Sequence, residues 1–258
     1  MLEVSTPEIT AWVGRYIWPF FRIAGFMAVA PIFGANFVAR RVRLLLAVAV
    51  TLVIVPVLPP VPRMDPLAVE HILLILNQVL IGICMGFILQ VFVQVFVLAG
   101  QVIGMKMGLG FALMNDPSNG VSVAVLSQFY LMMVSLLFLA SNGHLVALEV
   151  VAESFYTIPV NVKGLTQDDI AMIPLWGSWM FAGATLMAMP AIVALTIINM
   201  AFGVMSRAAP QLNVFALGFA FTLVLGIAVT WVTQTNTLTL YQVFVGDALQ
   251  FMRLIIKA

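Results

Sequence analysis

The chain has 258 residues, of which 63% are hydrophobic and only 8% are charged. Soluble domains carry about 25% charged residues, so this composition indicates a protein whose solvent is the lipid bilayer. The net charge of +1 and the single cysteine, Cys84, exclude a nucleic-acid-binding surface and an internal disulfide framework.

Long apolar stretches between the charged residues predict about six membrane-crossing segments. They are too long for strands and show no alternation of apolar and polar residues, so the expected fold class is all-α. The first stretch lacks the basic flank of a cleavable signal, and we expect it to be retained. The expected spans are residues 12–30, 44–58, 71–104, 121–140, 175–205 and 214–232.

Arg22 lies near the middle of the first expected span. An arginine that faces lipid at this depth costs roughly 2.5 to 3.5 kcal/mol, so the side chain needs a partner. It could reach the membrane surface or meet a neighbouring helix, or it could serve conduction.

Basic residues in the short connections indicate the orientation of the chain. The first connection holds Arg40, Arg41 and Arg43, the third holds Lys106, and the fifth holds Arg207. Because basic loops face the cytoplasm, both termini are expected on the opposite side of the membrane.

The third expected span would be about 50 Å long, against a hydrocarbon core of about 30 Å. It must therefore tilt, bend or leave the bilayer. Gln90, Gln94 and Gln101 lie within about 40° of one another around its axis. This glutamine stripe predicts hydrogen bonds to other helices or a water-filled lumen. Gly82 and Gly86, four residues apart, predict close helix packing.

The connection after this span combines glycines with bulky apolar residues. Gly104, Gly108 and Gly110 are expected to let the backbone leave the helix, while Phe111, Leu113 and Met114 could fill a narrow lumen. The alternative is an ordinary connector between helices.

The fourth connection, residues 141–174, is the best internal boundary of the chain. Its stretch 145–156 is apolar enough for a short amphipathic helix. The fifth span contains Pro190, which is expected to bend it.

Catalytic motifs are not found in the sequence. It contains no serine elbow, no His-Glu-x-x-His and no P-loop, and its two histidines, His71 and His144, are far apart. We therefore expect no enzyme activity, no cofactor and no metal site. An autonomous small-molecule transporter remains an alternative, although the sequence shows no repeated halves.

Two motifs are specific. The first is the run 108–112 followed by Asn115-Asp116-Pro117, and the second is Arg-x-x-Pro-Gln-x-Asn-x-Phe over residues 207–215. With the basic junction at 38–46 and the proline-containing helix, they resemble the FliR family of flagellar export proteins, which injectisome export gates share. The resemblance covers essentially the whole chain and departs at Ala220, where the family would have proline.

The resemblance implies an architecture in two parts. Residues 1–170 would resemble FliP, with four hydrophobic segments and a plug near 108–120, and residues 171–258 would resemble FliQ, with a helical hairpin and a C-terminal tail. The chain would join FliP and FliQ subunits in a helical cone of the flagellar basal body, at the inner membrane and largely above the bilayer. Its other partners would be further membrane proteins of the export apparatus, unfolded export substrates and membrane lipid.

The function implied is that of a structural and gating subunit of the flagellar type III export channel. An injectisome homologue is the alternative within the family, and purification would distinguish both from a transporter, which should be competent by itself. The channel plug would comprise Gly108, Gly110, Phe111, Leu113, Met114, Asn115, Asp116 and Pro117. Contacts to partner subunits would involve Arg22, Gln90, Gln94, Gln101, Arg207, Pro210, Gln211, Asn213 and Phe215.

Overall fold

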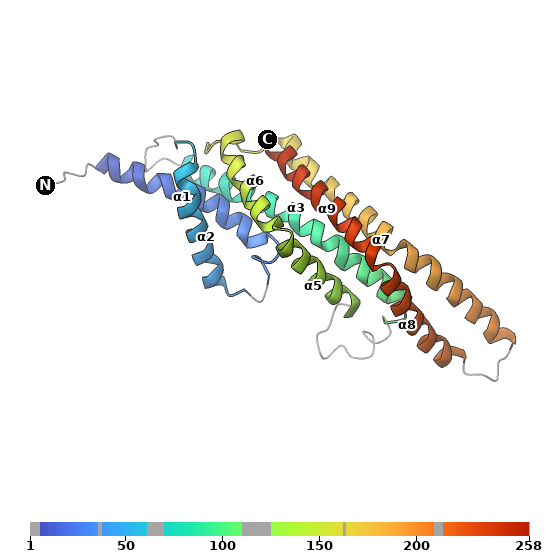
Figure 1. Cartoon of the computed structure of the whole chain (residues 1–258). Coiled ribbons are helices and arrows are strands. Elements are labelled where there is room, and N and C mark those ends of the chain that lie inside the picture. Colours follow the sequence, from blue (N-terminus) through green and yellow to red (C-terminus); the bar gives the residue numbers. More distant parts are fainter. Residues whose placement is uncertain are drawn as a thin grey trace. The chain divides into compact units, whose positions relative to one another are not determined.

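Every regular element in the part of the chain that the computed structural model describes is helical (Figure 1). The described residues are 6–35, 38–60, 70–109, 125–161, 164–208 and 214–257. The expected all-α fold is confirmed, and a helix coincides with each of the expected spans. The elements are α1 (Thr6–Val29), α2 (Arg40–Ile54), the 3-10 turn η1 (Val55–Val57), α3 (Glu70–Lys106), α5 (Val125–Ala140), α6 (Gly143–Thr157), α7 (Gln167–Ala208), α8 (Val214–Val232) and α9 (Gln234–Ile256).

Helices α6 and α9 differ in how well the sequence anticipated them. Helix α6 is the short helix expected within the fourth connection. Helix α9 occupies residues that were expected only as a tail, because its threonines, Gln234 and Asp247 interrupt the apolar run on which the spans were based. Its buried residues nevertheless recur at helical spacing. They are Thr237, Tyr241, Phe244, Ala248, Met252, Ile255 and Ile256.

Fewer helices than the expected six are long and apolar enough to cross a membrane among the described residues. Among the described residues, Ile72–Lys106 and Gln167–Ala208 are each long and apolar enough to cross a membrane. Up to four spans result if α5 with α6, bent by 68°, and Gly218–Val232 of α8 with α9, bent by 55°, each count as one. Helix α2 has 15 residues and is only about 22 Å long, short of the roughly 30 Å needed. The expected orientation depended on six crossings and stays a prediction.

The helices form two compact units that interleave along the chain. The first unit comprises Met1–Val91, Phe138–Gly177 and Gly246–Ala258, and the second comprises Phe92–Leu137 and Ser178–Val245. Helices α3, α7 and α9 each contribute one part to either unit. The expected division between residues 170 and 171 stays a prediction.

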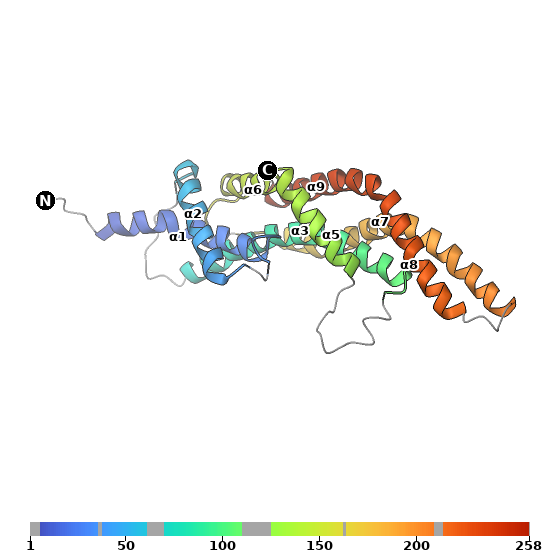
Figure 2. The ribbon, with the colours of Figure 1, turned by 60° about the horizontal axis from the view of Figure 1, so that its bottom comes forward.

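In the first unit, α1 and α3 pack with their backbones in close contact. A Cβ on Gly82 of α3 would collide with the carbonyl of Arg22, and one on Gly86 would lie 2.8 Å from the carbonyl oxygen of Phe26. A Cβ on Gly25 of α1 would lie 2.6 Å from the carbonyl oxygen of Val79. The close packing expected at Gly82 and Gly86 is therefore confirmed. Helix α2 crosses α1 in both views (Figure 1 and Figure 2).

In the second unit, aromatic side chains of α3, α7 and α9 form the centre. The Phe96 and Phe244 rings meet edge to face with centroids 6.0 Å apart, and Trp179 meets Phe244 at 5.3 Å. Tyr241 contacts both Phe92 and Phe96. Such edge-to-face pairs contribute about 0.5 to 1.5 kcal/mol each beyond the area they bury. This cluster joins the parts of the three helices that belong to the second unit.

Candidate functional site

The C-terminal end of α3 leads directly into the predicted plug. The N–H of Leu109 donates to the carbonyl of Gly104 at 3.0 Å, and the N–H of Gly108 donates to that of Met105 at 3.1 Å. This pair of bonds is a Schellman motif, which needs a left-handed residue just beyond the helix. Gly108 supplies it with φ +86°. Gly108 therefore ends α3 and redirects the chain, as the sequence predicted, whereas Gly104 stays within the helix.

Helix α8 holds this end of α3 in the second unit. A Cβ on Gly108 would lie 2.9 Å from the ring of Phe219, so the backbone turn rests directly on that aromatic side chain. The buried Met107 packs against Gly226, where α8 has no side chain to obstruct it. The backbone at the start of the predicted plug is therefore held in place by its packing against α8.

Helix α5, which follows the predicted plug, packs closely against α3. A Cβ on Gly100 of α3 would lie 2.8 Å from the Cα of Ser127 and 2.9 Å from the ring of Tyr130, both on α5. Ser127 and Tyr130 are buried. The two helices on either side of the predicted plug, α3 and α5, are therefore in close backbone contact.

Most residues of the predicted plug lie outside the described residues. Gly108 and Leu109 belong to the described part and form the turn that ends α3. The residues outside it are Gly110, Phe111, Leu113, Met114, Asn115, Asp116 and Pro117. Their assignment to a plug stays a prediction.

The glutamine stripe keeps its place on α3, where Gln90, Gln94 and Gln101 are each half-buried. Neighbouring apolar residues, such as Phe92 and Phe96, are completely buried. Half-burial leaves the amide groups open to a polar environment on one side of the helix. It is compatible with both predicted alternatives, hydrogen bonds to other helices and a wet lumen.

The motif near residues 207–215 is described only at its edges. Arg207 is exposed in the last turn of α7. Phe215 lies in the first turn of α8, and Pro210, Gln211 and Asn213 fall outside the described residues. Partner contact at this turn stays a prediction.

Arg22 is the most conspicuous polar residue of the first unit, because its side chain is completely buried. Its Nε donates to Oε1 of Gln78 at 2.8 Å, and its Nη1 donates to the carbonyl and hydroxyl oxygens of Ser154 at 2.7 and 2.9 Å. Its Nη2 donates to the carbonyl of Ile158 at 2.8 Å, and the guanidinium lies 4.1 Å from the ring centre of Phe155. These groups replace water around the charge.

This arrangement shows how the charge of Arg22 is satisfied within the chain. Four hydrogen bonds and a cation–π contact satisfy the guanidinium, and they come from α3, α6 and the residue after α6. Of the alternatives that the sequence left open, the contact with neighbouring helices is the one observed. Acceptors far away in the sequence come together at this point, and the expected contact of Arg22 with a partner subunit stays a prediction.

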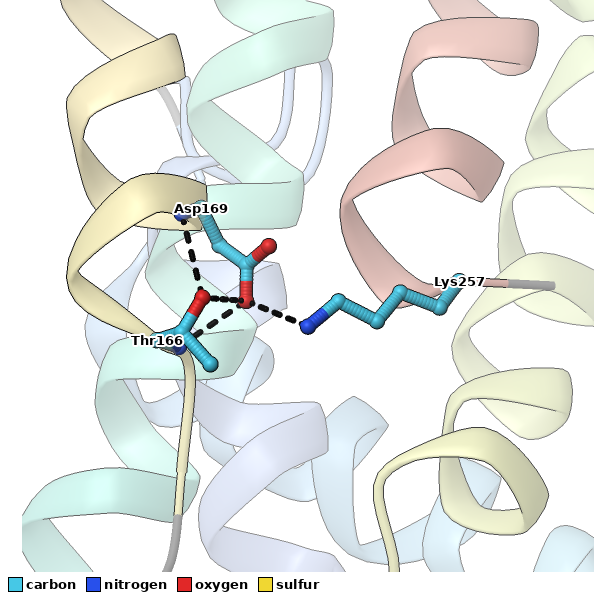
Figure 3. A network of polar contacts seen from close by, with 3 residues as sticks. All are labelled: Thr166, Asp169 and Lys257. Atoms are coloured by element: carbon cyan, nitrogen blue, oxygen red, sulfur yellow. Dashed lines mark hydrogen bonds and ion pairs between the residues drawn. The ribbon is translucent and has the colours of Figure 1, made fainter.

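A second polar network, which the sequence prediction did not include, lies at the start of α7 (Figure 3). The N–H and hydroxyl of Thr166 donate to Oδ2 of Asp169 at 2.9 and 2.6 Å, and the N–H of Asp169 donates back to the threonine hydroxyl at 3.3 Å. This is a capping box, in which Asp takes the place of the usual Glu. Lys257, at the end of α9, pairs with the same carboxylate oxygen at 3.0 Å. The Thr-x-x-Asp spacing before an apolar run is the signal that could have revealed the cap.

Two further contacts hold the end of α9 within the first unit. Nε of Arg253 lies 3.2 Å from Oε2 of Glu153 on α6. The rings of Phe251 and Trp176 are stacked, with centroids 4.3 Å apart and an angle of 5° between their planes. The end of α9 is therefore attached to both α6 and α7. Within the described ranges, no group of three His, Cys, Asp or Glu side chains gathers in a way that could hold a metal ion.

Comparison with known proteins covers nearly the whole chain. The model of a family described as bacterial export proteins, family 1, matches residues 13–248. The flagellar biosynthetic protein FliR of Escherichia coli K12 is 36% identical over 230 residues, which are 88% of this chain and 87% of the relative. FliR of Pectobacterium carotovorum is 34% identical over 227 residues, with the same two coverages. FliR of Bacillus subtilis is 28% identical over 220 residues, covering 84% of this chain and 83% of the relative.

Proposed function

The chain belongs to the family of bacterial export proteins, family 1, and from this premise we propose that it is a structural and gating subunit of the flagellar type III export channel. In this role it passes unfolded flagellar proteins across the inner membrane and supports assembly of the flagellum. The observation that carries the proposal is a similarity to FliR proteins that extends over 88% of the chain. The relatives reported above are flagellar, which favours the flagellar system over an injectisome.

The gating part of the proposal rests on the junction between α3 and α5. A seal for a channel that passes unfolded chains must yield without unfolding the helices that carry it. The Schellman turn at Gly108 and the contacts of Gly100 with Ser127 provide a rigid frame on both sides of residues 110–124. The apolar residues Phe111 and Met114 of that segment can seal a lumen by excluding water.

The structural part of the proposal rests on the apolar surface that the helices expose. On α7, exposed apolar residues recur every three or four positions, which places them on one face of the helix. They are Leu186, Met189, Val193, Ile197, Met200 and Val204. A face of this kind supports side-by-side packing with further helices in a hetero-oligomer, for which we propose FliP and FliQ subunits. In this proposal, residues 1–170 act as the FliP-like part and residues 171–258 as the FliQ-like part.

A deletion strain tests the proposed function. The chain should restore export of flagellar proteins to the medium in a flagellated bacterium that lacks its own copy of the gene. It should also copurify with FliP and FliQ from the same cells. If the deletion strain exports flagellar proteins and assembles flagella normally without the chain, the proposal is rejected. Substrate transport by the purified chain alone would favour an autonomous transporter instead.

A further inference from the structure

Helix α2 buries little of its own surface in the first unit. Ala47 and Thr51 are its buried residues. By contrast, Leu44, Leu45, Leu52 and Val53 are between 56% and 74% exposed. Four large apolar side chains on one short helix need an apolar environment beyond that unit.

An apolar groove runs between α2 and α6 of the same unit. Its volume is about 450 Å³, and its walls include Val50, Val53 and Ile54 of α2 and Leu148 of α6. Glu149 is the one ionisable residue in the lining. An elongated apolar ligand fits these walls better than a polar one.

Two exposed arginines lie at the N-terminal end of α2, whereas the groove lies beside its C-terminal half. Arg40 and Arg41 open the helix and are both exposed. Arg43 differs, because its side chain turns back and donates to the carbonyls of Phe33 and Ala35 at 3.0 and 3.1 Å. Neither Arg40 nor Arg41 joins the ion pairs found within the described ranges. Two positive charges therefore remain available at one end of an apolar surface.

The dimensions of α2 match one leaflet of a bilayer. Its 15 residues extend about 22 Å. Half of a hydrocarbon core of about 30 Å, together with one headgroup region, amounts to roughly 20 to 22 Å. With the arginines at headgroup level, the groove beside Val53 and Ile54 would lie near the ends of the acyl chains.

We propose that α2 and α6 bind one anionic phospholipid, with its phosphate at Arg40 and Arg41 and an acyl chain in the groove. Charge complementarity selects the anionic headgroup at the arginine end. Glu149 repels a phosphate from the groove end and so sets the direction of the lipid. This site is independent of the proposed export function, because it needs only the first unit and a membrane.

Photolabelling tests the site in the full-length chain. The chain is reconstituted into bilayers that contain phosphatidylglycerol or phosphatidylcholine, each with a photoreactive group near the end of one acyl chain. Peptide mapping by mass spectrometry then locates the attached lipid. We expect the phosphatidylglycerol probe to label the peptides of α2 and α6 at least about fivefold more than the phosphatidylcholine probe, since each arginine near an anionic surface contributes roughly that factor.

Variants separate the charge from the groove. The double variant Arg40→Gln with Arg41→Gln should remove the preference for phosphatidylglycerol, and Arg40→Lys with Arg41→Lys should keep it. The matched control is Arg207→Gln, which removes an equally exposed arginine from the end of α7. This control should leave the preference unchanged.

Three outcomes would overturn the proposal. Equal labelling of α2 by both probes would show that no headgroup is selected. Loss of the preference in millimolar inorganic phosphate would show that the arginines bind free phosphate and not a lipid. Absence of lipid label from α2 when partner subunits are present, with crosslinks to a partner helix in its place, would show that a protein occupies the groove.

Discussion

Lys257, directly after the end of α9, pairs with the buried carboxylate of Asp169 at the start of α7, with 3.0 Å between Nζ and Oδ2. The same carboxylate oxygen accepts two hydrogen bonds from Thr166 (Figure 3). Asp169 therefore has two tasks. It caps a helix locally and attaches the end of the chain to that helix.

We predict that the two partners of this ion pair differ in importance. Asp169→Ala should lower the free energy of unfolding by about 0.5 to 2 kcal/mol, because it removes the capping box. Lys257→Ala should cost less than about 1 kcal/mol, since 57% of the lysine side chain is exposed and water screens the pair. Thermal unfolding of the full-length chain in detergent, followed by its helical signal, measures both. Equal losses in the two variants would contradict the assigned capping role.

Arg22→Leu should destabilise the first unit by roughly 3 kcal/mol or more. The leucine leaves acceptors of Gln78, Ser154 and Ile158 without their donor, and each buried acceptor costs about 1 to 3 kcal/mol. The matched control is Arg15→Leu, which replaces an exposed arginine on the same helix and should change stability little. Unfolding in detergent compares the two variants. A tolerated Arg22→Leu would show that the observed hydrogen bonds contribute no net stability.

Gly82→Ala should separate α1 from α3, because the added methyl group collides with the backbone carbonyl of Arg22. We expect a loss of about 1 to 3 kcal/mol, typical of overpacking at a rigid contact. Gly177→Ala is the control within a helix. No atom lies within 4 Å of its added Cβ, so the alanine should stabilise α7 by up to about 1 kcal/mol. Opposite signs in the same unfolding assay would confirm the contact, and a loss of equal size in both would refute it.

The plug prediction concerns residues outside the described part of the chain. Phe111→Ser combined with Met114→Ser should leave expression and assembly close to normal but raise passive ion leakage, since polar side chains no longer exclude water from the lumen. Conductance across bilayers that contain the assembled gate measures the leak. Serine substitutions at Val57 and Val61, in the second connection, should not leak. If the assembled double variant conducts no more than its parent, residues 109–119 are only a connector.

The orientation prediction can be tested at the end of α7. Ala208→Cys, in a chain with Cys84→Ala, should react with a membrane-impermeant thiol reagent from the cytoplasmic side only. Ala208 is exposed, so its thiol would be accessible to the reagent. Labelling from the outside of intact cells would reverse the orientation derived from the basic connections.

The sequence by itself determined the helical class of the protein and the positions of most helices. Apolar runs without alternation can satisfy their backbone groups in lipid only as helices, and this constraint is local. Gly82, Gly86 and Gly108 were also identified correctly, because small residues at a spacing of four and glycine at a helix end have local meaning. Helix α9 was not predicted, because an amphipathic helix lacks the continuous apolar run that marks a membrane span.

Only the tertiary structure decided which groups the charged side chains contact. The sequence showed that Arg22 needs a partner, but Gln78 is 56 residues away and Ser154 is 132 residues away. No local pattern links positions so far apart. The same holds for Lys257 and Asp169, which meet because α9 returns to the start of α7. Desolvation of a charge creates the demand for a partner wherever the residue lies, whereas the packing of the helices determines which acceptor meets that demand.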